Sequence, residues 1–349
     1  MRREGTGVSK VKFVLAPMDG MTHAPFRQVC FEYGAEGATT EMISALSYGR
    51  VKKKRTAFEE TLARLPGEGN LAAQLIGNTP EDMAAAARRL TALNRFDAID
   101  INMGCPARKV VGSGNGAAIM RNPELAAGIM RAVCESTSLP VRLKMRLGWD
   151  DHSVTAPVIA QIAQDLGLES ITLHGRTRMQ MYRGNVNTEA IRAICRSVSI
   201  PIYANGGVAC AQDALTFLEN TGASGVSIGR AALKQPWIFD DIRRLMRGDP
   251  VLHRDAPERV TLLIHLARLS CRVRPEGLAV CEMRKFSAWI LAGLTNAEKA
   301  VSLICRTSTL DDFERVLDDY LEGLVRTGDI GVHPELAPPP SLDTLRIPG

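Results

Sequence analysis

The length, composition and charge of the chain fit a globular protein with one large domain and a smaller one. It has 349 residues, of which 45% are hydrophobic and 23% charged. No apolar run approaches the ~18 residues that a membrane span needs, and the basic N-terminus lacks the apolar stretch of a secretion signal. We therefore expect a cytoplasmic protein without a membrane partner. The net charge of +5 permits a polyanionic partner without requiring one.

The eight cysteines are scattered and form no C-x-x-C pair. This spacing argues against a disulfide framework and against a zinc site, so we expect no bound metal. Most of the cysteines are expected to be small buried hydrophobic residues. The sequence does not define the oligomeric state, and a monomer is the simplest expectation.

Short apolar runs recur at roughly the 30-residue spacing of β-α units. Strands are predicted at residues 11–18, 38–42, 71–77, 98–104, 141–146, 170–176, 200–206 and 225–229. Helical periodicity lies between most of them, at residues 81–94, 123–134, 155–166, 188–198 and 211–219. Eight strand–helix alternations predict a parallel (β/α)₈ TIM barrel over residues 1–246. An open sheet with fewer strands is the alternative.

The pattern changes after residue 246. Residues 247–259, RGDPVLHRDAPER, are charged and interrupted by proline, which is typical of a linker. Residues 260–326 show only helical periodicity and predict a small all-α bundle. Residues 327–349 form a proline-rich tail that is expected to be loosely ordered.

The stretch over residues 98–116, AIDINMGCPARKVVGSGNG, combines a predicted strand with an abrupt turn and a basic, glycine-rich loop. In a strand, Asp100 and Asn102 share one face and the apolar residues share the other. Polar residues facing inward suit a sheet closed around a lined cavity. Cys105 follows the carboxyl end of the strand, which is where α/β barrels carry their chemistry. We interpret Cys105 as the reacting group.

Polar or glycine-rich residues end most of the other predicted strands. They are Pro17, Met18 and Asp19 after the first strand, Gln74 on the third, Lys144 and Arg146 on the fifth, His174 and Arg176 on the sixth, Asn205, Gly206 and Gly207 on the seventh, and Gly229 and Arg230 on the eighth. Glycines in the last two loops are typical of a barrel phosphate site. With a lysine deeper in the same cavity, the pattern predicts a flavin mononucleotide.

The predicted chemistry is a hydride transfer followed by a proton transfer. A lysine ammonium beside the flavin stabilises the negative charge of the reduced ring. Hydride delivery to an activated C=C bond leaves a centre that needs a proton, and a positioned acid contributes ~10²–10⁴ in rate. The thiol of Cys105 can supply that proton if its pKa is not strongly depressed.

Six motifs make the chain resemble one family. They are APMDGMTHAPFR at residues 16–27, INMGCPARKV at 101–110, LKMRLGW at 143–149, ITLHGRTR at 171–178, IPIYANGG at 200–207 and SIGRAALKQPWIF at 227–239. Together they resemble the bacterial tRNA-dihydrouridine synthases and are most similar to the B type.

The resemblance implies an enzyme that reduces the C5–C6 bond of specific uridines in the tRNA D-loop. Bound FMN would supply hydride to C6, NADPH would reduce the flavin, and Cys105 would donate the proton to C5. The implied flavin-binding residues are Pro17, Met18, Asp19, Gln74, Lys144, His174, Asn205, Gly206, Gly207, Gly229 and Arg230.

The resemblance also implies contacts to the RNA. Asn102 would lie beside the target uracil, Arg176 would contact substrate, and Arg284 with Lys285 would be a basic pair of a helical tRNA-binding domain. The run of basic residues at 50–55 matches no motif of the family. Our hypothesis is that it touches tRNA phosphates, and a solvated helix start is the alternative.

The chain departs from the family pattern at residues of the barrel rim and of the helical domain. His23-Ala24 stands where an acidic and then a basic residue are more usual, and Phe286 stands where the B type tends to have histidine. Two rival functions also stay open. One is a flavin barrel that reduces a free pyrimidine or another small molecule, and the other is an RNA-binding protein without catalysis.

Overall fold

Eight parallel strands close into a barrel in the order of the sequence. The computed structural model describes residues 12–50, 56–333 and 336. The strands are β1 Lys12–Leu15, β2 Ala38–Ser44, β3 Leu71–Ile76, β4 Ala98–Met103, β5 Val141–Arg146, β6 Ser170–His174, β7 Ile202–Asn205 and β8 Gly225–Ile228. Strand β1 pairs with β8 over four residues, which closes the ring. The predicted (β/α)₈ barrel is confirmed.

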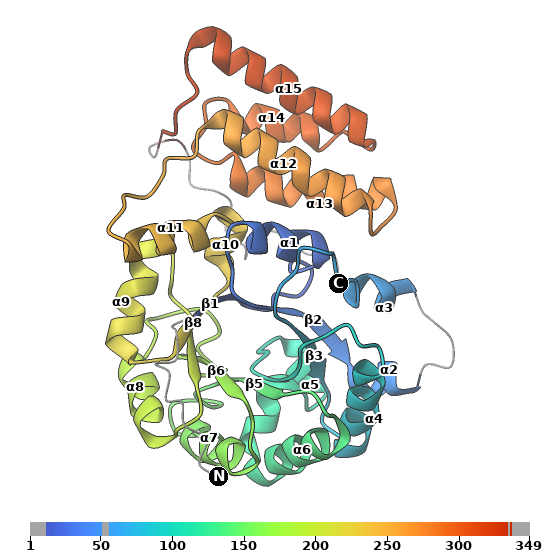
Figure 1. Cartoon of the computed structure of the whole chain (residues 1–349), viewed down its shortest axis with the longest axis vertical. Coiled ribbons are helices and arrows are strands. Elements are labelled where there is room, and N and C mark those ends of the chain that lie inside the picture. Colours follow the sequence, from blue (N-terminus) through green and yellow to red (C-terminus); the bar gives the residue numbers. More distant parts are fainter. Residues whose placement is uncertain (1–11, 51–55, 334–335, 337–349) are drawn as a thin grey trace, which may run out of the picture.

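Helices surround the barrel (Figure 1). They are α1 Ala24–Glu32, α2 Ala45–Arg50, α3 Thr56–Thr61, α4 Pro80–Thr91, α5 Arg108–Gly112, a 3₁₀ turn at Gly116–Arg121, α6 Pro123–Ser136, α7 Ala156–Asp165, α8 Thr188–Ser197, α9 Ala211–Thr221, α10 Arg230–Lys234 and α11 Ile238–Met246. The five helices predicted from periodicity correspond to α4 and α6–α9. Helix α1 was not predicted because its N-cap is a histidine, whose Nδ1 accepts from the Phe26 N–H at 3.3 Å.

The barrel interior is polar, as the alternation in β4 predicts. Asp100 and Asn102 both bond to the side chain of Gln74 on β3, so these three side chains share the inner face. The apolar residues of β4 alternate with them and are fully buried in the hydrophobic core. Packing against the helices therefore holds the strands, while the inner face is left for polar groups.

Four helices follow the barrel in the sequence and lie beside it, and we refer to them as the helical domain (Figure 1). They are α12 Ala256–Cys271, α13 Glu276–Ile290, α14 Ala297–Ile304 and α15 Leu310–Thr327. Helix α12 lies against α1, and α13 lies against α10 (Figure 1). Helix α12 begins inside the segment predicted as a linker. The reason is a capping box, in which Asp255 accepts from the Glu258 N–H and Glu258 accepts from the Asp255 N–H.

The junction between the two domains has an aromatic centre and a charged margin. Phe286 stacks on Phe26 of α1, with ring centroids 5.1 Å apart. Beside it, Glu282 of α13 lies 3.2 Å from His23 and also pairs with Arg274. Phe286, a departure from the family pattern, is therefore part of the core between the domains.

The end of the described chain folds back on the helical domain. The Ala256 N–H donates to the Ile330 carbonyl at 3.0 Å, and the His333 N–H donates to the Gly293 carbonyl at 2.7 Å. Residues 51–55 of the basic run and most of the proline-rich tail lie outside the described residues. No helix in the described part of the chain has both the length and the hydropathy needed to cross a bilayer.

Candidate active site at the barrel mouth

The Cys105 loop leaves β4 under the control of Asn102. The Asn102 Oδ1 accepts the backbone N–H groups of Gly104 at 3.1 Å and Cys105 at 2.9 Å. The Asn102 Nδ2 donates to the Gln74 Oε1 at 2.8 Å. Both ends of the Asn102 amide therefore bind protein groups, which makes this residue a support for the loop. A contact between Asn102 and uracil stays a prediction.

The Cys105 thiol is half-buried and keeps its proton near neutral pH. Burial raises the pKa of this thiol, and the nearby Asp19 carboxylate raises it further. Lys144 and Arg146 act in the opposite direction but do not outweigh burial. A protonated thiol at the end of a barrel strand is suited to donating a proton.

Lys144 extends into the barrel from β5, the neighbour of β4. Its Nζ donates to the Asn205 Oδ1 at 3.0 Å, and the Asn205 Nδ2 donates to the Ser227 carbonyl at 2.7 Å. Burial lowers the pKa of Lys144 to about 8. Among the described residues, no carboxylate forms an ion pair with this ammonium. A partly buried cation whose hydrogen bond goes to a neutral amide can still bind an electron-rich or anionic group.

Arg146, two residues after Lys144, joins the Cys105 loop to the loop that follows β6. Its Nε donates to the Gly104 carbonyl at 2.9 Å, and its Nη1 donates to the carbonyls of Thr177 and Met181. The guanidinium also lies 5.5 Å from the centroid of the Tyr182 ring. The sequence placed Arg146 on the same face as Lys144 but gave no sign of this bridging role, because both loops lie far from it in the chain.

His174 and the glycines after β7 fit closely together. A Cβ on Gly206 would lie 2.7 Å from the His174 ring, and Gly206 has φ +111°, so glycine is required there. Burial and the surrounding cations hold the pKa of His174 well below its usual value, which keeps the ring neutral. Arg176 reaches the same place, with its Nη1 3.3 Å from the His174 Nε2. A cavity of about 360 Å³ opens beside Arg176, Gly206 and Gly207.

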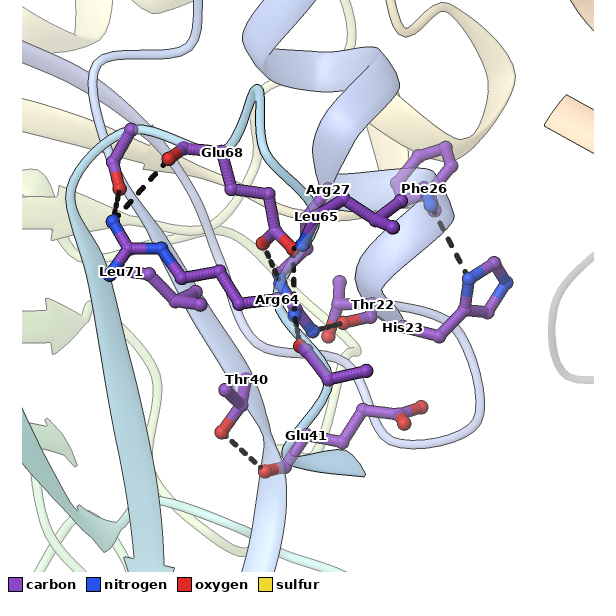
Figure 2. A network of polar contacts seen from close by, with 12 residues as sticks. Thr22, His23, Phe26, Arg27, Thr40, Glu41, Arg64, Leu65, Glu68 and Leu71 are labelled. Carbon is purple, nitrogen blue, oxygen red and sulfur yellow. Dashed lines mark hydrogen bonds and ion pairs between the residues drawn. The ribbon is translucent and has the colours of Figure 1, made fainter. Parts of the chain in front are cut away.

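The loop after β1, which contains Pro17, Met18 and Asp19, is shaped by a buried ion pair. Thr22 Oγ1 accepts the Met18 N–H at 3.0 Å, and the Thr22 carbonyl accepts from Arg27 Nη1 at 2.7 Å. Arg27 Nε in turn lies 2.6 Å from Glu68 Oε2, and both side chains are fully buried (Figure 2). Sequence reasoning missed this pair because its members belong to segments 41 positions apart.

The loop after β8 meets the loop after β6 at Tyr182. Gly229 precedes α10, and the Arg230 guanidinium lies 4.8 Å from the centroid of the Tyr182 ring. The same ring lies under Arg146. Arg146 at the end of β5, His174 at the end of β6 and Arg230 after β8 are therefore brought together around one exposed tyrosine.

The predicted basic pair of the helical domain points in two directions. Arg284 Nη2 donates to the Thr307 carbonyl at 3.3 Å, inside the helical domain. Lys285 Nζ donates to the Gly20 carbonyl at 3.4 Å, in the first loop of the barrel. Successive residues of a helix differ by about 100° in direction, so neighbours in sequence need not share a surface. Contacts of this pair with RNA stay a prediction.

Two arginines, Arg121 and Arg178, stack on Trp149 at the barrel mouth. The guanidinium of Arg121 lies 4.9 Å from the Trp149 ring, and that of Arg178 lies 4.8 Å from it. The loops that carry them are bonded together, because the Arg178 N–H donates to the Gly148 carbonyl at 2.9 Å. Sequence reasoning did not single out Arg121 or Trp149, since their three loops meet only in the folded barrel.

Comparisons with known proteins agree with the motifs. The chain is 43% identical over 293 residues to a probable tRNA-dihydrouridine synthase of Rhizobium leguminosarum bv. phaseoli, covering 83% of this chain and 89% of the relative. It is 37% identical over 331 residues to tRNA-dihydrouridine synthase B of Xanthomonas axonopodis pv. citri, covering 93% and 96%.

Among solved structures, an old yellow enzyme homologue from Zymomonas mobilis is similar with a TM-score of 0.50 at 15% identity, covering 72% of this chain and 92% of that one. Histamine dehydrogenase from Rhizobium sp. 4-9 is similar with a TM-score of 0.51 at 10% identity, covering 74% and 48%. At such identities these likenesses show the barrel fold alone. Residues 14–322 match the family described as dihydrouridine synthase (Dus). The chain therefore belongs to the dihydrouridine synthase family, as its motifs predict.

Proposed function

We propose that this protein reduces the C5–C6 double bond of specific uridines in the D-loop of tRNA, with FMN as bound cofactor and NADPH as the reductant of the flavin. Membership of the family and the names of the relatives support the reaction and the substrate. The observation that carries the proposal is the placement of two groups on adjacent strands. The ammonium of Lys144, which forms no ion pair with a described carboxylate, lies on the strand beside the one that leads into the Cys105 loop, and burial raises the pKa of the Cys105 thiol.

The residues at the mouth fit an anionic flavin. Four cations from β5, the loop after β6 and the start of α10 act together on the neutral His174: Lys144, Arg146, Arg176 and Arg230. Lys144 and Gln74 would bind the ring, while Gly206, Gly207, Gly229 and Arg230 would hold the phosphate end. When bound, the flavin supplies the hydride that adds to C6 of the uracil.

The chain itself supplies the proton and the electrostatic support for this reaction. The Cys105 Sγ–H donates its proton to C5, which forms the C5–H bond and leaves a thiolate. Lys144 and Arg146 stabilise this thiolate, because both cations act to lower the pKa of Cys105. Arg146 also holds the Gly104 carbonyl, so the loop stays in place when the charge appears. A positioned acid of this kind contributes about 10²–10⁴ in rate.

The rim gives a reason for an RNA substrate. The segments that follow the carboxyl ends of the strands carry exposed cations, among them Arg108, Lys109, Arg121, Arg183 and Arg230, and Arg178 is partly exposed. Arg121 and Arg178 stack on Trp149, and neither forms an ion pair with a described carboxylate. Such a surface binds a phosphate backbone without reading its sequence. A uridine inside folded tRNA has to leave its stack to enter the barrel, at a cost of a few kcal/mol that these contacts can offset.

The experiment is to map dihydrouridine in tRNA from cells that lack the gene and then to restore it with the wild-type protein or with Cys105→Ala. The wild-type protein is expected to restore dihydrouridine at D-loop positions, and Cys105→Ala is expected to restore little or none. If the wild type restores none, and the purified protein instead reduces free uridine, the small-molecule alternative is correct. Full restoration by Cys105→Ala would remove the thiol from the mechanism.

A further inference from the structure

A chain of three hydrogen bonds leads from the barrel interior to the Cys105 loop. Asp100 Oδ2 accepts from Gln74 Nε2 at 2.7 Å, and Gln74 Oε1 accepts from Asn102 Nδ2 at 2.8 Å. Asn102 Oδ1 then accepts the backbone N–H of Cys105 at 2.9 Å. Gln74 and Asp100 are in register on neighbouring strands, and Asp100 comes two residues before Asn102 on β4. The series of hydrogen bonds therefore begins deeper in the barrel than Asn102.

The carboxylate at the start of this chain sets its direction. An ionised carboxylate only accepts hydrogen bonds, whereas an amide has one donor end and one acceptor end. Asp100 therefore selects the NH₂ end of Gln74, which leaves the oxygen of Gln74 for Asn102. If Gln74 turned over, Asn102 would have to turn over as well. Its NH₂ group would then face the N–H of Cys105, and two donors would meet.

The hydrogen bonds of Asp100 lead only toward the Cys105 loop, although two cations of β5 also act on its charge. The Asp100 side chain is 3% exposed, and among the described residues it hydrogen-bonds only to Gln74. Lys144 and Arg142 of β5 act to lower the pKa of Asp100, but neither forms an ion pair or a hydrogen bond with it, because Arg142 pairs with Glu169 and Lys144 donates to Asn205. A buried carboxylate with one hydrogen bond destabilises a fold relative to an apolar residue of similar size. Its presence therefore points to a role in the site.

We propose that Asp100 is a positioning residue, which fixes the orientation of the Gln74 and Asn102 amides and thereby holds the Cys105 loop in its proton-donating conformation. The part of this proposal that concerns proton donation rests on the proposed function. The part that concerns the loop does not, because the conformation of the loop can be measured without RNA or turnover. Hydrogen-bonded chains of this kind couple their members, so a change at one end reaches the other.

The first test is the rate at which iodoacetamide labels Cys105 in the purified protein, followed by peptide mass spectrometry. Asparagine at position 100 can present either end to Gln74, so Asp100→Asn permits the native direction without enforcing it. We expect Cys105 to be labelled about fivefold faster, because the loss of one hydrogen bond raises the population of loop conformations that expose the thiol by about that factor. The exposed Cys210, Cys281 and Cys305 serve as internal references and should be labelled at unchanged rates.

A matched control removes a carboxylate that pairs with a neighbouring residue of β5. Glu169→Gln breaks the pair with Arg142, which is outside the chain of hydrogen bonds, and should leave the labelling of Cys105 unchanged. The single-turnover rate on tRNA should fall in Asp100→Asn while KM for tRNA stays within about twofold, because the loop and not the RNA surface is affected. Unchanged labelling of Cys105 in Asp100→Asn would overturn the proposal.

A double-mutant cycle separates action through the chain from a general effect on the fold. Asn102→Asp still accepts the N–H of Cys105 but cannot donate to Gln74, so it interrupts the series of hydrogen bonds. In that background, Asp100→Asn should cause no further acceleration of labelling. An equal acceleration in both backgrounds would show that Asp100 acts by another route. If Asp100→Asn does not fold, Asp100→Ser, whose hydroxyl also both donates and accepts, takes its place in the same cycle.

Discussion

The cations on the two sides of the barrel mouth contact different kinds of groups. On the side of the helical domain, Arg27 and Arg274 are bound by carboxylates, and Arg27 is completely buried. On the opposite side, Arg121 and Arg178 stack on Trp149 and have no ion pair with a described carboxylate. The first group uses its charge to hold loops and domains together. The second group keeps its charge available for an anion, although a tryptophan fixes its position.

Breaking the buried pair should have the largest effect on stability. Arg27→Met leaves Glu68 buried without its partner and should lower the free energy of unfolding by about 3–5 kcal/mol. Arg192→Gln, which removes a surface ion pair on α8, is the matched control and should cost less than about 1 kcal/mol. Urea denaturation measures both. Equal losses in the two variants would show that the buried pair does not hold the Met18 loop and the residues around Glu68 together.

Lys144 lies between these two groups, because it is partly buried inside the barrel but, among the described residues, forms no ion pair with a carboxylate. Its contact to a bound flavin is expected to contribute about 1.5–3 kcal/mol, so Lys144→Met should weaken FMN binding by roughly 10–150-fold. Flavin fluorescence during titration gives the affinity. An unchanged affinity in Lys144→Met would place the flavin elsewhere.

The affinity of the wild type for FMN should also depend on pH. Burial lowers the pKa of Lys144 to about 8, so the ammonium is lost as the pH rises through that value and binding weakens. The contribution of Lys144 to the stability of the flavin-free protein changes with pH in the opposite direction and becomes more favourable as the pH rises. The folded state binds this proton less tightly than the unfolded state, so Lys144 destabilises the fold below pH 8, and this loss shrinks as the pH rises toward 10.5. Lys144→Met should show neither trend.

The rim arginines should affect RNA binding and little else. Arg121→Gln combined with Arg178→Gln should reduce the slope of log K against log salt by about 0.7–0.9 for each phosphate that these arginines neutralise. The stability of this variant should change by less than about 0.5 kcal/mol. Arg131→Gln with Arg196→Gln, exposed arginines on α6 and α8, is the control of equal charge. Identical slopes in the two double variants would exclude the rim as the RNA surface.

The sequence was sufficient for the parts of the fold that depend on local patterns. Alternation in β4 correctly placed Asp100 and Asn102 on the inner face, and the spacing of apolar runs predicted the eight strands. Contacts between distant segments could not be predicted in this way. The pairing of Arg27 with Glu68 and the stacking of Arg121 on Trp149 depend on loops that meet only when the barrel closes. Arg284 and Lys285 show the same limit within one helix, because adjacency in sequence did not place them on one surface.

In the proposed mechanism the thiol of Cys105, in the loop after β4, donates the proton that completes the reduction. The most direct measurement mixes flavin-reduced protein with unmodified tRNA and follows both the return of oxidised flavin absorbance and the formation of dihydrouridine. The wild-type protein should form one dihydrouridine for each flavin oxidised, and Cys105→Ala should be about 10²–10⁴ slower with flavin still bound. A Cys105→Ala protein that turns over tRNA at the wild-type rate would show that this thiol is not the proton donor.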